Sequence, residues 1–397
     1  MSHSDPFKEA APVLEKIQRG GYEAYFVGGC VRDYLLKRPV ADVDIATSAT
    51  PQEIKALFKN TVDVGIEHGT VMIIEHGKGY EITTYRSETL YSDFRRPDGV
   101  QFVRSLKEDL KRRDFTINAM AMTVDYEVTD LYGGRHDLEN GLIRTVGASE
   151  ERFSEDALRM LRGARFASQL SFVIEEKTLG SMNELSPLLQ HIAVERKRME
   201  MDKLLMGKNW TTGLEYMVKA QFLPYLPHFP VTEEEINDFR QMAVQHLSAN
   251  QRWALIMLKL EQSECESALK NWRLSKKRMN YIKDMIELYY QRMNHYWSFM
   301  EVYAWGKERV IQADRLYAAV NQLQSDEQNI GKLWEALPIY SQKDLVVNGK
   351  DLIAWSDRTA GPWMGSLFSD IEKAILEGRL DNSKSEIKKW VKEWHQK

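Results

Sequence analysis

The first third of the chain carries short apolar runs that predict β-strands. These runs span residues 25–27, 71–74 and 80–85. Apolar residues at helical spacing predict a helix within residues 5–20, and Pro51 following Thr50 predicts the start of a second helix that ends near residue 58. The pattern therefore indicates a small sheet accompanied by helices.

The pattern changes near residue 149, where strand alternation gives way to helical periodicity that continues to the C-terminus. Ser154 is the expected N-cap of the first helix in this region. The helices are predicted at residues 155–168, 194–206, 233–247, 251–258 and 276–293, with more helix within residues 313–397. A strand-containing part is thus followed by a part that is helical throughout.

A polar segment at residues 87–111 interrupts the strand-containing part. It contains a Pro-Asp-Gly turn at residues 97–99 and has few helix or strand signals. We expect such a segment to form a mobile loop, and loops of this kind often lie beside active sites.

Composition is ordinary for a globular protein, with 43% hydrophobic and 28% charged residues among 397. The net charge of −4 gives no general sign of nucleic-acid binding, so any such surface must be local. The two cysteines, Cys30 and Cys265, lie far apart and offer no zinc spacing. The N-terminus lacks an apolar signal region, and no apolar run approaches the roughly 20 residues that cross a bilayer. We expect a cytosolic protein without a membrane role.

Chemistry is indicated first by Asp42 and Asp44. On a strand, Asp-Val-Asp places both carboxylates on one face, and such a pair suits Mg²⁺, which usually keeps water and substrate phosphate in its remaining positions. Upstream, Gly28 and Gly29 form a tight turn between a strand and a helix, where backbone N–H groups can approach an anion. Arg32, one turn into that helix, adds a forked donor for phosphate. The glycines alone would indicate only a turn, but together these residues predict a triphosphate and metal site.

Two further residues are candidates for the same site. Glu81, on the strand at residues 80–85, could position an attacking hydroxyl or hold a second metal, although an ordinary cross-strand charge explains it equally well. Arg113 could bind phosphates, although a basic run is usually a solvated face.

The dipeptide His136-Asp137 has no partner histidines and is predicted to form part of a turn.

The helix predicted at residues 155–168 carries a possible base-reading pair. Asp156 and Arg159 are three residues apart and therefore neighbours on its polar face, with Arg162 and Arg165 on the same half. A carboxylate only accepts hydrogen bonds and a guanidinium only donates them, so the pair matches the amino group and ring acceptor shared by cytosine and adenine. Guanine and uracil would leave buried polar groups unpaired. The alternative is a solvated ion pair of small energy.

These motifs resemble the class II tRNA nucleotidyltransferases, the CCA-adding enzymes, in the polymerase β-like superfamily. The resemblance is strong over the first 210 residues and rests mainly on pattern and length beyond them. The matching stretches are residues 28–33 with 42–44, residues 112–119, residues 155–159, and residues 195–200, which look like the motif that braces the neck.

The resemblance implies an α+β protein whose nucleotidyltransferase head has a small mixed sheet, followed by a helical neck, body and tail. The implied boundaries are residues 1–148, 149–210, 211–312 and 313–397. It also implies a tRNA-binding tail, and the basic residues that could touch phosphates are Lys276, Lys277, Arg278, Lys343, Lys350, Lys384, Lys388 and Lys389. The oligomeric state stays open, with a homodimer as one candidate.

The implied reaction is the addition of C, C and A to the tRNA 3′ end from CTP and ATP, without a nucleic-acid template. In the head, Asp42 and Asp44 would hold Mg²⁺, with Glu81 nearby, and the triphosphate and sugar would be bound by the Gly28-Gly29 turn, Arg32 and Arg113. In the neck, Asp156 and Arg159 would read the base, and Arg162 and Arg165 would support the nucleotide.

Residues 92–100 resemble the loop that such enzymes use to switch from CTP to ATP, and its polar residues favour full CCA addition over the CC-adding type. The nearest rival is a poly(A) polymerase, which shares the head and neck. A glycosyltransferase would explain the two aspartates but not Arg113 or the pair in the neck. A non-catalytic RNA-binding module would not need Asp42.

Overall fold

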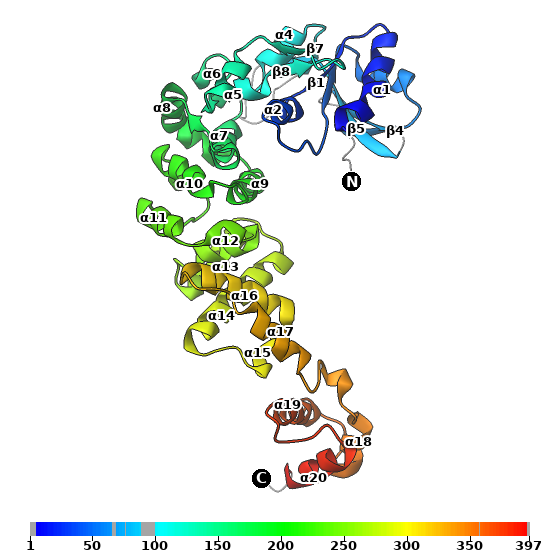
Figure 1. The fold of residues 1–397 in the computed structure, drawn as a ribbon, viewed down its shortest axis with the longest axis vertical. Helices are drawn as coiled ribbons and strands as arrows, with labels where there is room; N and C mark the ends of the chain where they lie inside the picture. The colour runs from blue at the N-terminus through cyan, green and yellow to red at the C-terminus, as the bar shows by residue number, and fades with distance from the viewer. Residues whose placement is uncertain (1–4, 66–68, 76, 89–99, 357, 395–397) are drawn as a thin grey trace. The chain divides into compact units, whose positions relative to one another are not determined.

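The computed structural model describes residues 5–65, 69–75, 77–88, 100–356 and 358–394. Two compact units make up the chain. The first is Met1–Ile236 with Lys270–Arg273, and the second is Asn237–Leu269 with Leu274–Lys397. The predicted α+β class is confirmed, because the first unit contains a mixed sheet and the second is helical (Figure 1).

The main sheet of the first unit has seven strands in the order β3-β4-β5-β2-β1-β8-β9. Strands β2 and β5 are parallel, and the other neighbours are antiparallel. The strands are β1 (Ala24–Val27), β2 (Ile45–Thr47), β3 (Thr61–Gly65), β4 (Thr70–Glu75), β5 (Lys78–Thr84), β8 (Met120–Met122) and β9 (Val128–Asp130). The strands predicted at residues 71–74 and 80–85 are confirmed as β4 and β5, which pair antiparallel as a hairpin.

Local sequence signals explain where the early helices start. In α1 (Pro6–Arg19) the carboxylate of Asp5 accepts a hydrogen bond from the backbone N–H of Phe7 at 3.0 Å. In α3 (Pro51–Leu57) Thr50 and Glu53 form a capping box. The other helices around the sheet are α2 (Gly29–Leu35), α4 (Leu106–Lys111) and α5 (Gly134–Glu139).

Both faces of the central strands are covered. On one face Phe7 of α1 packs edge-on against Phe26 of β1, with ring centroids 5.0 Å apart. On the other face Leu110 of α4 joins a buried cluster that includes Val27, Ala46 and Ala121. Side chains alternate along a strand, so Asp44, two residues before Ala46, belongs to the same face of the sheet as this second cluster. The candidate site lies on that face.

The predicted mobile loop at residues 87–111 is partly wrong. A short sheet pairs β6 (Arg86–Glu88) with β7 (Val100–Phe102), and α4 follows, so both ends of the segment are ordered. Strands this short are stabilised by pairing with each other, which local sequence patterns do not reveal. The resembled loop at residues 92–100 lies outside the described residues except for Val100.

Helices α6 (Ser149–Glu155), α9 (Val194–Leu205) and α10 (Trp210–Lys219) contact α7 (Leu158–Leu170). The hydroxyl of Ser168 donates a hydrogen bond to the carbonyl of Leu204 at 2.6 Å, and a Cβ on Gly213 would lie 2.9 Å from Cβ of Ser168. Glycine at this position thus lets the helices approach closely. This part of the chain also contains α8 (Glu176–Leu185) and a small sheet of β10 (Leu142–Ile143) and β11 (Val173–Ile174). The division between the two units falls within α11 (Glu233–Gln241).

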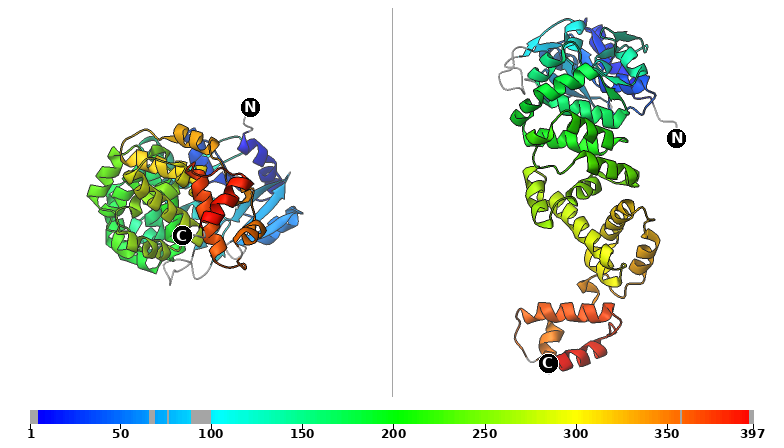
Figure 2. Two further views of the ribbon diagram at one scale, coloured as in Figure 1. Left: turned by 90° about the horizontal axis from the view of Figure 1, so that it is seen from below. Right: turned by 90° about the vertical axis from the view of Figure 1, so that its left-hand side faces the viewer.

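The later part of the chain is helical in the described residues, as the yellow to red segments show (Figure 2). Its core is apolar and includes Leu288, Val310, Leu352, Leu367 and Ile387, all with exposed fractions of 0%. The helices are α12 (Ala249–Met257), α13 (Gln262–Asn271), α14 (Lys276–Asn294), α15 (Phe299–Trp305), α16 (Lys307–Val320), α17 (Glu327–Glu335), α18 (Gly349–Ser356), α19 (Trp363–Leu376) and α20 (Lys384–Trp394).

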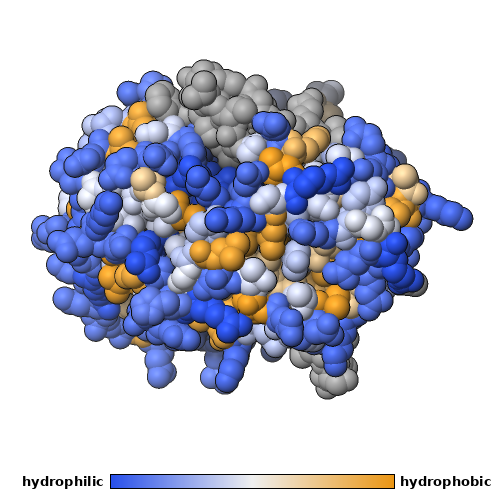
Figure 3. Space-filling view, turned by 90° about the horizontal axis from the view of Figure 1, so that it is seen from above, coloured by the Kyte–Doolittle hydropathy of each residue, from blue (hydrophilic) through white to orange (hydrophobic). Residues whose placement is uncertain are grey.

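Hydrophilic side chains cover most of the face drawn in Figure 3, where hydrophobic residues form only small patches. Among the described helices, none has both the length and the apolar character that a bilayer span requires. The predicted basic residues Lys384 and Lys389 lie in the second unit, where they pair with Asp351 and Glu386.

Candidate active site

The two aspartates lie immediately before β2. The backbone N–H of Val27 donates to the carbonyl of Asp44 at 3.0 Å, which extends the pairing of β1 and β2 by one residue. Asp42 and Asp44 are exposed and Val43 is buried, so the predicted alternation is present although the strand itself starts at Ile45. Both carboxylates therefore belong to one face.

Glu81 lies beside this pair. Strands β2 and β5 are parallel with Ile45 opposite Ile82, so the preceding residues, Asp44 and Glu81, are neighbours. Asp44 is exposed in part, but the surrounding protein removes enough water from its carboxylate to raise its pKa. The nearby charges of Glu81 and Asp42 add to this shift, and Arg113 opposes it. Four charged groups thus act on one another at this edge of the sheet.

The donor set is consistent with Mg²⁺. Within the described residues, no three or more His, Cys, Asp and Glu side chains group closely enough to enclose a metal by themselves. Mg²⁺ does not require such a cage, because it is usually held by one or two carboxylates, water and substrate phosphate. An exposed pair of carboxylates matches that requirement.

Gly28 forms the turn between β1 and α2 with φ 76° and ψ −133°, a conformation that L-residues rarely adopt. A Cβ at this position would lie 3.0 Å from Nη1 of Arg113 and 3.9 Å from Oδ2 of Asp44. The turn, the guanidinium and the carboxylate therefore surround one point. Gly29, which starts α2, lies beside Arg32, since a Cβ on it would be 3.6 Å from Nη2 of that arginine.

Both head arginines are held by hydrogen bonds. Nε and Nη2 of Arg32 bind the carboxylate of Asp33 at 3.0 and 2.9 Å, and Nη1 donates to Oδ1 of Asn118 at 2.8 Å. Nη2 of Arg113 donates to Oδ2 of Asp109 at 3.2 Å, and its Nε is buried without a hydrogen-bond partner in the described residues. A buried donor of this kind is suited to an anionic ligand.

An ion pair joins this region to α7. Nε and Nη2 of Arg162 lie 2.7 and 2.6 Å from Oδ2 of Asp114, whose Oδ1 accepts from the amide of Asn118 at 3.1 Å. Burial opposes the charged form, but Arg162 and Asn118 hold the pKa of Asp114 well below its usual range. Asp114 thus stays ionised at neutral pH and fixes Arg162.

Three guanidiniums surround the ring of Phe166. Those of Arg32, Arg162 and Arg165 lie 5.2, 5.6 and 4.2 Å from its centroid. Nε of Arg165 also lies 3.0 Å from Oε2 of Glu200. Burial lowers the pKa of Arg165 to about 10. The positive charges of Arg162 and Arg32 lower this pKa further, and the negative charge of Glu200 raises it. Three guanidiniums are thus gathered around one ring, and each of them is also paired with a carboxylate.

The helix predicted at residues 155–168 is broken at Asp156, so that prediction is wrong in part. Helix α6 ends at Glu155 and α7 begins at Leu158, whose N–H donates to Oδ1 of Asp156 at 3.0 Å. Oδ2 of Asp156 accepts from Nη2 of Arg196 at 2.8 Å. An aspartate that caps the following helix competes with continuation of the preceding one.

Arg159 does not lie on a solvated polar face, contrary to the prediction, because only 8% of it is exposed. Arg165 is also buried, at 7%. Nη1 of Arg159 donates to Oε2 of Glu155 at 2.5 Å, and Nη2 donates to the carbonyl of Arg112 at 2.9 Å. The structure thus excludes a purely solvated ion pair, since other groups fix both Asp156 and Arg159.

Several site residues were missed from the sequence. Asp109 was hidden in the polar segment taken for a loop, and Asn118 looked like part of an apolar run. Glu155 gave no signal beyond its place in the motif. Arg196 and Glu200 lie in the stretch that resembles the neck-bracing motif, and they hold Asp156 and Arg165 respectively.

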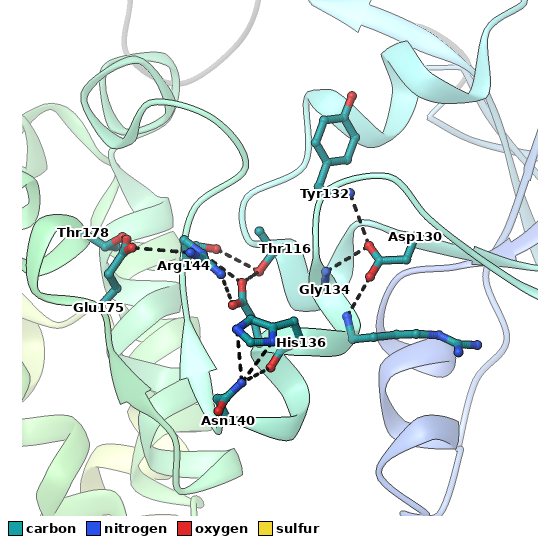
Figure 4. A network of polar contacts seen from close by, with 11 residues as sticks. Thr116, Asp130, Tyr132, Gly134, His136, Asn140, Arg144, Glu175 and Thr178 are labelled. Atoms are coloured by element: carbon teal, nitrogen blue, oxygen red, sulfur yellow. Dashed lines mark hydrogen bonds and ion pairs between the residues drawn. The ribbon is translucent and has the colours of Figure 1, made fainter.

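The dipeptide His136-Asp137 lies in α5 rather than in a turn, and Figure 4 shows the surrounding network. Asp137 is fully buried and accepts from the hydroxyl of Thr116 at 2.5 Å and from Nε of Arg144 at 3.1 Å. Asn140 approaches both ring nitrogens of His136 at 3.3 Å. These hydrogen bonds hold Asp137 and His136 within the surrounding fold.

Family models match three parts of the chain. They are the poly(A) polymerase head domain over residues 24–144, the probable RNA and SrmB-binding site of polymerase A over residues 171–233, and tRNA nucleotidyltransferase domain 2 over residues 244–391. The matched residues make up most of the sequence and include both units.

Curated relatives match over the full length. The chain is 46% identical to the CCA-adding enzyme of Enterococcus faecalis over 396 residues, which cover 98% of this chain and 97% of that protein. It is 45% identical to the CCA-adding enzyme of Streptococcus pyogenes serotype M3, with 99% and 98% covered. The crystal structure of the Bacillus stearothermophilus CCA-adding enzyme in complex with CTP is 37% identical, with a TM-score of 0.90 over 99% of this chain and 98% of that one.

Proposed function

The chain belongs to the family of CCA-adding enzymes, and from this premise we propose how its residues carry out the reaction. CCA-adding enzymes transfer C, C and A in turn to the 3′ end of tRNA, use CTP and ATP, need no nucleic-acid template and release pyrophosphate. The full-length identity to enzymes of this name does not favour a poly(A) polymerase or a CC-adding enzyme. One observation carries the assignment of the site, namely the meeting of Asp44, Arg113 and the Gly28 turn around one point.

The triphosphate binds against the Gly28-Gly29 turn. Gly28 leaves the space that any side chain would fill, and Arg113 offers a buried Nε without a partner in the described residues. Arg32 adds a guanidinium whose orientation is fixed by Asp33 and Asn118. Fixed donors bind a charged substrate without reorganising during the reaction.

Asp42 and Asp44 hold Mg²⁺ through their exposed carboxylates. When bound there, Mg²⁺ supplies neutralisation of the negative charge that builds up on the phosphates. Glu81 lies on the side of Asp44 away from β1, where it can orient the attacking 3′-hydroxyl. The hydroxyl gives up its proton to water, and its oxygen forms a bond to the α-phosphorus as the bond to pyrophosphate breaks.

Asp156 and Arg159 read the base edge. The carboxylate accepts from the amino group that cytosine and adenine share, and the guanidinium donates to the adjacent ring nitrogen. Guanine and uracil present a carbonyl and an N–H at these places, so neither protein group would find a hydrogen-bond partner on the base. Arg196 and Glu155 hold the two side chains in place, while Arg162 and Arg165 add positive charge nearby.

The test compares wild type with Asp42→Asn on a tRNA that lacks its CCA end, with Mg²⁺ and CTP. We expect C addition to fall at least ~100-fold because one metal ligand is neutralised. Affinity for tRNA, measured by filter binding, should stay within about threefold, since the substitution adds no bulk. Equal rates of addition would contradict the assignment of Asp42, and poly(A) synthesis by wild type would contradict the proposed reaction.

A further inference from the structure

Asp109 is a carboxylate that the proposed reaction does not use directly. It lies on α4 with none of its surface exposed. Oδ1 accepts from Nε and Nη2 of Arg112 at 3.0 and 2.8 Å and from the backbone N–H of Arg86 at 3.4 Å. Oδ2 accepts from Nη2 of Arg113 at 3.2 Å. One buried carboxylate therefore holds two consecutive arginines.

The first consequence concerns Arg113. Because its Nη2 is bound to Asp109, its Nη1 reaches the space beside Gly28, which Oδ2 of Asp44 also borders. A second, weaker hydrogen bond, from Nη1 to the carbonyl of Asn118 at 3.5 Å, is long. Asp109 is thus the closest of the partners that set the direction of this guanidinium.

The second consequence concerns Arg159. Its Nη2 donates to the backbone carbonyl of Arg112 at 2.9 Å. The side chain of Arg112 is fixed on Asp109, and the backbone of the same residue therefore has a defined position. Asp109 therefore holds Arg113, which lies at the catalytic acids. It also holds Arg112, whose carbonyl binds Arg159.

The charge of Asp109 persists at neutral pH. Burial disfavours the ionised form, but Arg112 and Arg113 outweigh it and hold the pKa of this carboxyl below its usual value. An uncharged side chain would remove the anion that both guanidiniums face, and their side chains are only 16% and 18% exposed. Both would then move.

We propose, on the basis of the function proposed above, that Asp109 is a positioning residue that aligns Arg113 with the triphosphate and Arg159 with the base. Phosphate binding and base choice are thereby coupled through one side chain. Loss of its charge weakens nucleotide binding and relaxes base selection together.

The test is Asp109→Asn, which keeps the shape and removes the charge. We measure kcat and KM for CTP on a tRNA lacking its CCA end, and the ratio of C to U added when both nucleotides are present. KM should rise about tenfold, which corresponds to ~1.4 kcal/mol, and the preference for C should fall by a similar factor. A merely structural role would lower stability without changing this ratio.

A matched control is Asp314→Asn in the second unit. Asp314 is 2% exposed and accepts from Nε1 of Trp297, the hydroxyl of Ser325 and the N–H of Asp326 at 2.7, 2.8 and 2.6 Å. Its loss should lower the melting temperature and leave the ratio of C to U unchanged. A drop in selectivity equal to that of Asp109→Asn would overturn the proposal.

Two variants separate the possible failures. Arg159→Ala should lose its preference for C over U if the proposed function holds. If Arg159→Ala loses this preference while Asp109→Asn keeps it, only the positioning role of Asp109 is refuted. If Arg159→Ala stays selective, the proposed base reading fails instead. If Asp109→Asn does not fold, Asp109→Glu is the second variant, because it keeps the charge and shifts the arginines by about one bond length. Unchanged preference for C over U in folded Asp109→Glu would also refute the positioning role.

Discussion

The turn at Gly28 offers a sharp test of the site geometry through Gly28→Ala. At φ 76° and ψ −133° an alanine is strained, and backbone strain of this kind costs about 1–3 kcal/mol. For a unit of this size, each kcal/mol lowers the melting temperature by ~2–4 °C. We therefore expect a loss of roughly 2–12 °C, which thermal denaturation measures.

The new methyl group also enters the site. It would lie 3.0 Å from Nη1 of Arg113, closer than the 3.4 Å at which ordinary contact begins, while the 3.9 Å to Asp44 needs no adjustment. Arg113 must move by a few tenths of an ångström. Since a misplacement of ~1 Å can cost 100-fold in rate, we expect kcat/KM for CTP to fall about tenfold.

Gly21→Ala separates strain from intrusion. Gly21 has φ 88°, but nothing lies within 4 Å of a Cβ placed there. This control should lose stability and keep the wild-type rate of C addition. The geometric reasoning is refuted if Gly28→Ala retains wild-type kcat/KM, or if Gly21→Ala loses as much activity.

Two further predictions concern charge and pH. Desolvation and the charge of Glu81 raise the pKa of Asp44 in the folded state. Ionisation of Asp44 therefore destabilises the fold when the pH is above this pKa, and it has no effect when the pH is below the pKa of Asp44 in the unfolded state. Asp44→Asn should therefore melt at or above the wild-type temperature at pH 8, with the difference vanishing toward pH 4, while C addition falls at least ~100-fold; a clear loss of stability at pH 8 would contradict this. The ionisation of Asp114 has the opposite effect on stability, because its pKa is lowered in the folded state. It stabilises the fold when the pH is above the ordinary pKa of an aspartate, and this contribution is lost as the pH falls below that pKa. Asp114→Asn removes the carboxylate that holds the partly exposed Arg162, and it should cost about 2 kcal/mol at pH 7 in urea unfolding. Equal stability of the two proteins at that pH would count against the ion pair.

Much of the fold could be predicted because the signals are local. The alternation of Asp42, Val43 and Asp44, the hairpin of β4 and β5, and the cap at Thr50 all depend on neighbours within a few residues. The strand pair β6 and β7 depends instead on residues far apart in sequence, so its segment looked like a loop.

The neck shows why part of the site escaped prediction. Arginines on a helix predict a solvated face, yet Arg159 and Arg165 are buried because partners from other elements, the carbonyl of Arg112 and the carboxylate of Glu200, receive them. Asp156 ended a helix that its neighbours would continue, because it caps the next one. Asp109 carried no local signal at all, since its importance comes from the arginines that follow it.

The central claim is that the acids of the head perform the transfer while Asp156 and Arg159 choose the base. The most direct test supplies all four nucleotides to a tRNA lacking its CCA end and sequences the added tails. Wild type should add C, C and A, and Asp156→Ala should still add nucleotides while its preference for C over U falls at least ~100-fold. A folded Asp156→Ala that still adds only C, C and A, or that binds tRNA and adds nothing, would contradict the account.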